Sequence, residues 1–171
     1  FSVREGKTYL NDQDILLKGL RMSNALISDE ATDELIMNLD TFAYYGLNSF
    51  SVYLQGSRFG DIKGYREDCS VDPVFGSRLS RIIEAADQKG FVVLVGCLYY
   101  GNSKGWCESW TQAEANKAVK NTVTWLKDHN YRNVFIDVDN EGMARKAKNF
   151  ENRELVISGK AVDSSFVIAT N

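Results

Sequence analysis

Short strand-like runs alternate with amphipathic segments along most of the chain. The runs follow one another at 48–54, 91–98, 133–138 and 166–170, and the central ones are apolar at most positions. A strand that is apolar on both faces is typical of a parallel sheet covered by helices, whereas a sheet with one solvated face shows alternating polarity. The alternation therefore predicts an α/β fold.

The intervening segments carry apolar residues at helical spacing. Ser28 or Asp29 is placed to cap the first helix, and Gly46 is placed to end it. Thr111 and Glu114 have the spacing of a capping box at the start of the third. The predicted helices span residues 31–45, 77–89, 111–130 and, more weakly, 153–162.

At the start of the chain, turn residues separate short apolar stretches. We expect residues 1–14 to form a β-hairpin and the run from Ile15 to Leu20 to form a first buried strand. With 171 residues, the chain is close to the size of one domain of roughly 150 residues. Residues 15–171 are therefore expected to hold strands one to five and their helices within a single domain, 1–171.

Two architectures accommodate five such units. One is a doubly wound open sheet, in which the strand order reverses. The other is the first five strands of a (β/α)8 TIM barrel, which typically needs about 250 residues. No Gly-rich phosphate loop supports a nucleotide site: Lys18-Gly19-Leu20 has no second glycine, and residues 101–105 lack the P-loop order.

Composition excludes several classes of function. The formal net charge is −3, and Lys and Arg are scattered rather than arranged in a basic stripe, so no nucleic-acid partner is expected. The apolar runs are far shorter than the roughly 20 residues of a membrane span. Three cysteines and one histidine are too few for a disulfide scaffold or a multi-histidine metal site, and we expect no metal or cofactor. Free buried thiols are favoured, although Cys97 and Cys107 could pair in an oxidising compartment.

The end of the predicted fourth strand carries the most informative motif. Residues 133–139 lead directly into Asn140-Glu141. In parallel α/β folds the functional residues lie at the carboxyl ends of the strands. The sequence around this motif resembles the superfamily of retaining (β/α)8-barrel glycoside hydrolases that includes cellulases and mannanases.

The resemblance runs through the whole chain in order. Residues 9–20 are similar to the opening hairpin and first strand of that superfamily, residues 45–49 to the entry of its second strand, and residues 85–95 to its second helix and third strand. Three positions depart from the pattern: residues 51–53 lack the Arg and residues 96–98 lack the His of many members, and Gly142 replaces a common Pro.

The resemblance implies that Glu141 is the general acid/base and that Asn140 binds the sugar hydroxyl beside the reacting carbon. It places the second carboxylate, the nucleophile, on the seventh strand and therefore outside this chain. It thus implies hydrolysis of a β-linked oligo- or polysaccharide by a double displacement. The alternative is a non-catalytic carbohydrate-binding or scaffold protein derived from the same barrel.

Further substrate contacts are expected from loops after the second and third strands, because aromatic faces stack on sugar rings. The candidates are Arg58, Tyr99, Tyr100, Trp106 and Trp110. A secreted or periplasmic location is expected, with the cytoplasm left open, and unpaired barrel edges predict self-association. Asp137 precedes Glu141 by four residues and should share its strand face, so we expect it to have a cationic or hydrogen-bonding partner, with Lys18 or Arg21 as candidates.

Overall fold

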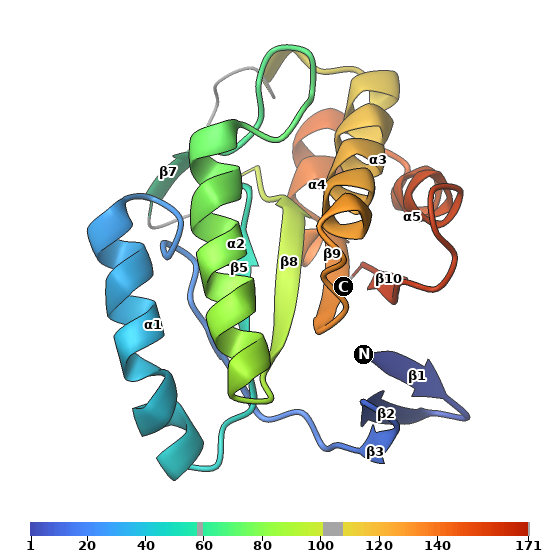
Figure 1. Ribbon diagram of the computed structural model, residues 1–171. Helices are drawn as coiled ribbons and strands as arrows, with labels where there is room; N and C mark the ends of the chain where they lie inside the picture. The colour runs from blue at the N-terminus through green and yellow to red at the C-terminus, as the bar shows by residue number, and fades with distance from the viewer. Residues whose placement is uncertain (58–59, 101–107, 171) are drawn as a thin grey trace.

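A computed structural model describes residues 1–57, 60–100 and 108–170 (Figure 1). Its main sheet, within these residues, has five strands in the order β10-β9-β8-β5-β4. Every neighbouring pair in this sheet is parallel. The strands are β4 (Gly19–Arg21), β5 (Ser49–Tyr53), β8 (Val92–Leu98), β9 (Val134–Asp139) and β10 (Ile168–Ala169).

The strand order decides between the two predicted architectures. The five strands are adjacent in the order in which they occur in the sequence, without the reversal that a doubly wound sheet requires. This arrangement confirms the prediction of an α/β fold with about five units of a (β/α)8 barrel. The pairing also aligns Tyr53, Gly96 and Asp137 across β5, β8 and β9, which fixes the geometry of the site described below.

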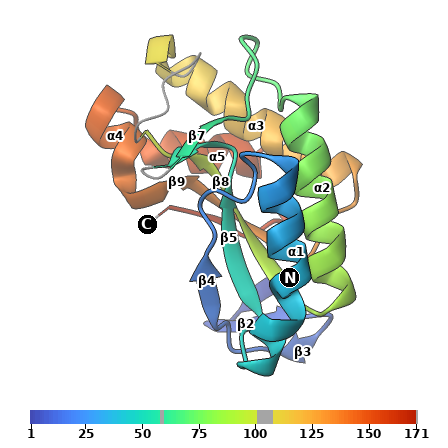
Figure 2. The ribbon, with the colours of Figure 1, turned by 90° about the vertical axis from the view of Figure 1, so that its left-hand side faces the viewer.

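Helices α1 (Asp29–Tyr44) and α2 (Pro73–Gln88) lie on the same side of the sheet (Figure 2). They are followed by α3 (Gln112–Asp128) and α5 (Asn152–Lys160). The core includes alternate residues of the central strands and the apolar stripes of the helices. Its fully buried members include Val52, Leu79, Val93, Val95, Ile82, Leu126 and Ile136.

The helix starts follow from their caps. The Ser28 hydroxyl accepts a hydrogen bond from the Ala31 amide, and the Glu114 carboxylate accepts one from the Thr111 amide, so both predicted caps form. The second helix begins at Pro73, four residues before the predicted start. Asp72 caps it, and a proline is well tolerated in a first turn because its missing N–H has no partner there in any case.

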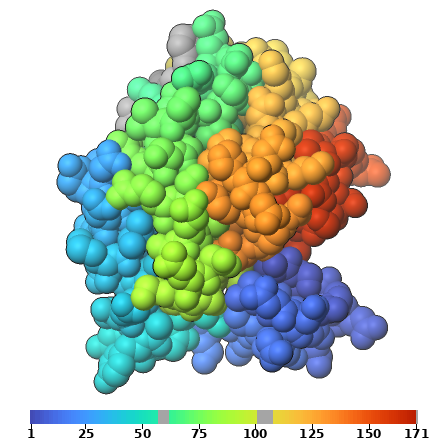
Figure 3. Space-filling view, in the orientation of Figure 1, coloured from blue at the N-terminus to red at the C-terminus, as the bar shows by residue number. Residues whose placement is uncertain are grey.

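The amino-terminal residues form more than the predicted hairpin. In the part of the chain that the structure describes, β1 (Ser2–Arg4), β2 (Lys7–Leu10) and β3 (Gln13–Asp14) make a three-stranded antiparallel sheet. It appears in dark blue at the lower right of Figure 3. The Phe1 ring lies 5.6 Å from that of Phe135, and the Phe1 ammonium donates to the Arg132 carbonyl. The small sheet is therefore attached near the amino end of β9.

The first strand of the main sheet differs from the prediction. It covers Gly19–Arg21 rather than residues 15–20, and all three residues are exposed, Leu20 by 41%. The physical reason is its place at the edge of the sheet, where β5 is its only strand neighbour among the described residues. The expectation of a buried first strand is therefore wrong.

Four further elements, β6, β7, η2 and α4, were not expected from the sequence. Residues predicted as a loop after the second strand form β6 (Gln55–Ser57) and β7 (Gly60–Lys63), an antiparallel pair. The segment after β9 forms a 3-10 turn, η2 (Asn140–Gly142), and a short helix, α4 (Met143–Lys148).

Cys69 and Cys97 are free and buried. No helix in the described ranges has the length and apolar character to cross a bilayer.

Candidate active site

Glu141 stands in a strained turn at the carboxyl end of β9. Its φ of 57° lies in the left-handed region, and that of Gly142, 59°, does so as well. A non-glycine residue in this region costs about 1 kcal/mol or more. Such strain concentrates at functional sites, where the surrounding structure holds it in place. Here, the turn gives Glu141 a side chain that is 48% exposed at the barrel mouth.

Side chains from separate parts of the described chain contact Glu141. Arg21, the last residue of β4, places Nη1 2.6 Å from Oε1. The Tyr99 hydroxyl, just beyond β8, donates to Oε2 over 3.4 Å. Lys146 of α4 donates to the main-chain carbonyl of Glu141 over 3.0 Å. The carboxylate is therefore held by contacts at both oxygens.

Asn140 is 3% exposed and is oriented by Tyr53, the last residue of β5. The Tyr53 hydroxyl donates to Asn140 Oδ1 over 3.0 Å. The other end of the amide, Nδ2, is buried and has no hydrogen-bond partner among the described residues. Since a buried amide donor without a partner is unfavourable, this group is ready to bind an acceptor such as a hydroxyl oxygen.

Gly96 makes room for the Tyr53 ring. A Cβ atom on Gly96 would lie 2.1 Å from Tyr53 Cδ1, which is far inside van der Waals contact. A cavity of about 330 Å³ adjoins these residues, and Arg21, Tyr53, Phe135 and Asn140 contribute to its lining. The neighbouring strands therefore place the Asn140 amide beside this cavity, whereas Glu141 lines a different cavity of about 510 Å³.

The other two carboxyl groups of β9 have different surroundings. Asp139 is fully buried and accepts hydrogen bonds from the Ala144 and Arg145 amides over 2.7 and 3.0 Å, which caps α4. Burial is the main reason that the pKa of Asp139 is raised. Both of its oxygens serve this structural role.

Asp137 is 5% exposed, and burial raises its pKa to about 6. Its Oδ1 accepts from the Asp139 amide over 3.2 Å, while Oδ2 has no partner among the described residues. Within the described residues, the Asp139 amide is the hydrogen-bonding partner that was predicted for Asp137. The two candidate cations were wrong: neither Lys18 nor Arg21 pairs with Asp137, and the Arg21 guanidinium forms its ion pair with Glu141 instead. A carboxyl group with a raised pKa avoids the cost of an unpaired buried charge by retaining its proton.

The other predicted contacts divide into three groups. Tyr99 reaches the site, but it is 2% exposed and offers its hydroxyl rather than an open ring face. Tyr100 packs edge-on against Phe150, and the buried Trp110 packs against Tyr65 in the core. Arg58 and Trp106 lie outside the described residues.

Arg21 and Tyr53 are the contributors that sequence reasoning did not assign to the site. Both are the last residues of their strands, which is the signal that could have identified them. Within the described ranges, no group of three or more His, Cys, Asp or Glu side chains is arranged to hold a metal ion.

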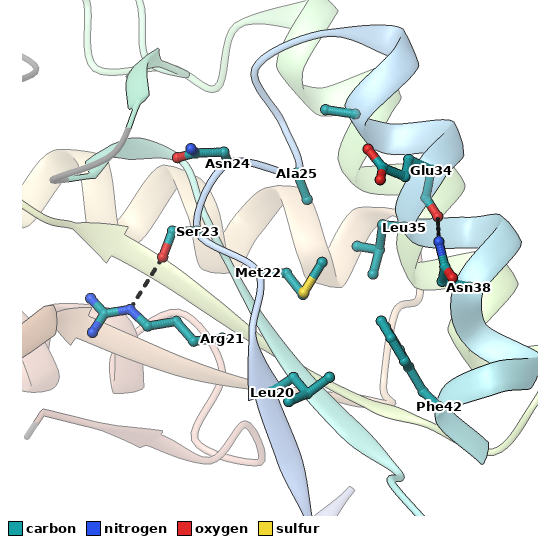
Figure 4. A pocket seen from close by; sticks show the side chains of 11 residues that line it. Leu20, Arg21, Met22, Ser23, Asn24, Ala25, Glu34, Leu35, Asn38 and Phe42 are labelled. Atoms are coloured by element: carbon teal, nitrogen blue, oxygen red, sulfur yellow. Dashed lines mark hydrogen bonds between the residues drawn. The ribbon is translucent and has the colours of Figure 1, made fainter. Parts of the chain in front are cut away.

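A second cavity, of about 610 Å³, lies between β4 and α1 (Figure 4). Met22, Leu35 and Phe42 contribute apolar side chains to it. Figure 4 shows the Arg21 side chain extending away from these three. Arg21 contributes to the lining of both cavities, but Met22, Leu35 and Phe42 line only this one.

No protein-family model matches the sequence, and a comparison with curated proteins finds no match. Solved structures do match. A family 5 glycoside hydrolase from Bacteroides vulgatus has 16% identity and a TM-score of 0.68, with 98% of this chain and 38% of that chain covered. A β-1,4-D-mannanase from Cryptopygus antarcticus has 15% identity and a TM-score of 0.66, with 95% and 58% covered.

The catalytic domain of the major endoglucanase from Xanthomonas campestris has 14% identity and a TM-score of 0.66, with 99% of this chain and 56% of that chain covered. This chain also covers 39% of the length of a further solved structure, which is described as a glycoside hydrolase. This chain thus spans between 38% and 58% of these four structures. At such identities the similarity shows the fold: the chain has the architecture of part of a (β/α)8 barrel.

Proposed function

We propose that this chain carries the acid/base half of a retaining glycoside hydrolase site for a β-linked oligo- or polysaccharide. Glu141 acts as general acid/base, and Asn140 binds a sugar hydroxyl through Nδ2. The observation that carries the proposal is the buried amide donor of Asn140, which lacks a partner among the described residues, directly beside a half-exposed carboxylate at a strand end. The fold shared with glycoside hydrolases supports the same assignment.

The reaction requires two carboxyl groups about 5 to 5.5 Å apart. In the first step Glu141 gives a proton to the leaving-group oxygen while a nucleophile attacks the anomeric carbon. In the second step the ionised Glu141 takes a proton from the water that cleaves the glycosyl–enzyme bond. The resemblance to retaining glycoside hydrolases places the nucleophile on the seventh strand, so we assign it to a residue outside this chain. The described neighbours Asp137 and Asp139 are buried, and Asp139 caps α4.

The test is hydrolysis by the full-length gene product and its Glu141→Gln variant. The amide cannot transfer a proton, and general acid/base catalysis contributes about 10²- to 10⁴-fold. We expect a loss of this size on unactivated oligosaccharides. Aryl glycosides with good leaving groups need little protonation and should lose much less in the glycosylation step.

Glu67→Gln is the matched control, because Glu67 is exposed in the turn before α2. It should retain wild-type turnover. Equal losses of kcat/KM, which reports the glycosylation step, on activated and unactivated substrates, or undiminished turnover in Glu141→Gln, would exclude Glu141 as the acid/base.

The second candidate function is carbohydrate binding without hydrolysis. The ion pair between Arg21 and Glu141 favours it, because a guanidinium stabilises the ionised carboxylate and not the acid. Oligosaccharide binding by the full-length protein without any hydrolysis would establish this alternative. In either case we expect the 171 residues alone to hydrolyse no aryl glycoside, since the nucleophile is assigned elsewhere.

A further inference from the structure

Arg21 is held in place independently of Glu141. Its Nε donates to the Ser23 hydroxyl over 3.2 Å. Its guanidinium carbon lies 5.0 Å from the centre of the Tyr99 ring and 5.5 Å from that of Tyr53. Cations are attracted to the faces of aromatic rings at such distances. Two strand-end tyrosines and one hydroxyl thus fix the direction in which the guanidinium points.

The same two tyrosines connect the guanidinium with both site residues. Tyr53 donates to Asn140, and Tyr99 donates to the carboxylate that Arg21 binds. A change in the position of Arg21 would therefore alter the surroundings of Glu141 and Asn140 together. This arrangement differs from an ordinary surface ion pair, in which two flexible side chains meet in water.

We propose that Arg21 is a positioning residue for Glu141: it fixes the orientation of the carboxylate and stabilises its ionised form, which is the form that activates water. The inference deepens the proposed function, and its kinetic part rests on that function. Among the described residues, other charged groups near Glu141 include Lys146, at its main-chain carbonyl, and Arg145, which lines the same cavity as Glu141. Asp137 lies four residues earlier on β9.

The first test needs no catalysis. In the 171-residue chain with ¹³C-labelled glutamate, the Glu141 carboxyl signal, assigned with Glu141→Gln, is followed by NMR as a function of pH. Arg21→Gln should move its titration midpoint to higher pH by about one unit, the low end for loss of a close opposite charge, because the pair is partly exposed. Arg21→Lys retains the charge, so the Glu141 titration midpoint in this variant should lie close to that of the wild type.

Arg132→Gln is the matched control. Arg132 also forms an ion pair, 3.1 Å from Asp163, and its guanidinium carbon lies 4.6 Å from the centre of the Phe166 ring. It lies before the amino end of β9, whereas Glu141 follows the carboxyl end. Its loss should leave the Glu141 midpoint unchanged.

The second test is kinetic and uses the full-length gene product with an activated aryl glycoside, for which deglycosylation limits turnover. Arg21→Gln should lower kcat by about 10- to 100-fold, the loss typical of a misplaced catalytic group, with little change in KM. The acidic limb of its pH–rate profile should move to higher pH together with the NMR midpoint. Arg21→Lys should recover part of the rate.

An unchanged Glu141 midpoint in both Arg21 variants would overturn the inference even if the protein is a hydrolase. A shifted midpoint with wild-type kcat in Arg21→Gln would overturn its kinetic part. A shifted midpoint in a protein that hydrolyses nothing would remove the proposed function and leave the control of the carboxylate by Arg21 in place. If Arg21→Gln does not fold, the Glu141 titration midpoint in Arg21→Lys is the deciding measurement. It should move in the same direction, to higher pH, by a smaller amount.

Discussion

Asp137→Asn should stabilise the chain at neutral pH. Asp137 is 5% exposed, and burial is the main reason that its pKa rises from 3.8 to about 6. At about 1.4 kcal/mol for each tenfold change in a proton-binding constant, this rise corresponds to about 3 kcal/mol. The buried group thus destabilises the fold by roughly that amount wherever it must ionise.

Proton linkage gives the direction in which the contribution of Asp137 to stability changes with pH. Between pH 3.8 and about 6 the folded chain retains the proton on Asp137, whereas the unfolded chain has released it. The contribution of this group to stability is therefore most favourable below pH 3.8, falls as the pH rises through this window, and levels off above it. Asparagine has no charge to bury, and its Oδ1 can still accept the hydrogen bond from the Asp139 amide.

Urea unfolding at pH 4 and pH 8, followed by tryptophan fluorescence, measures the effect. The free energy of unfolding of Asp137→Asn should exceed that of the wild type by about 2 to 3 kcal/mol at pH 8 and by close to nothing at pH 4. Asp163→Asn is a control for the pH window. Hydrogen bonds from Ser165 lower the pKa of Asp163 to about 2, so its contribution to stability is lost only between pH 3.8 and about 2, and its replacement should destabilise the chain by nearly the same amount at pH 4 and at pH 8.

Equal gains for Asp137→Asn at the two pH values would show that packing, not charge burial, is responsible. A loss at pH 8 would show that Asp137 is ionised and paired in the folded chain, and the reasoning would be refuted.

Three further outcomes are expected. Gly96→Ala should weaken oligosaccharide binding by the full-length gene product in calorimetry, because a Cβ would lie 2.1 Å from Tyr53 Cδ1 and displace the ring that orients Asn140; unchanged affinity would contradict this role for Tyr53. Ser28→Ala should lower the free energy of unfolding by about 1 kcal/mol through loss of the α1 cap, and an unchanged urea midpoint would count against the cap. The 171-residue chain should self-associate in sedimentation velocity, because β4 and β10 are the outer strands of the described sheet, whereas a concentration-independent monomer would show that these edges are protected.

The parts of the fold that the sequence predicted are those determined by local patterns. Continuous apolar runs identified β8 and β9, and side-chain caps located the starts of α1 and α3. The antiparallel pair of β6 and β7 was not predicted because its sequence shows no alternation of polar and apolar residues. The short helix α4 was not predicted because its start depends on Asp139. Asp139 can cap α4 only where the end of β9 has brought its carboxylate to the first turn of that helix.

In the site, too, residues marked by their neighbours in the sequence were predicted, whereas contacts between residues far apart in the sequence were not. Asn140 and Glu141 were found because they follow an apolar strand directly. Arg21 lies 120 positions before Glu141, and their contact exists only because β4 and β9 belong to one sheet. Sequence reasoning named Arg21 as a candidate partner of Asp137, which is the wrong carboxylate.

That error has a physical explanation in the different solvation of the two acids. Pairing Arg21 with Asp137 would require burial of both charges, and the desolvation of two ions can exceed their attraction. Glu141 is half exposed, so its ion pair with Arg21 avoids most of that cost. Asp137 instead remains protonated up to a pH of about 6. A single cation between a buried and an exposed carboxyl group therefore pairs with the exposed one, which is also the one that the proposed chemistry needs in its ionised form.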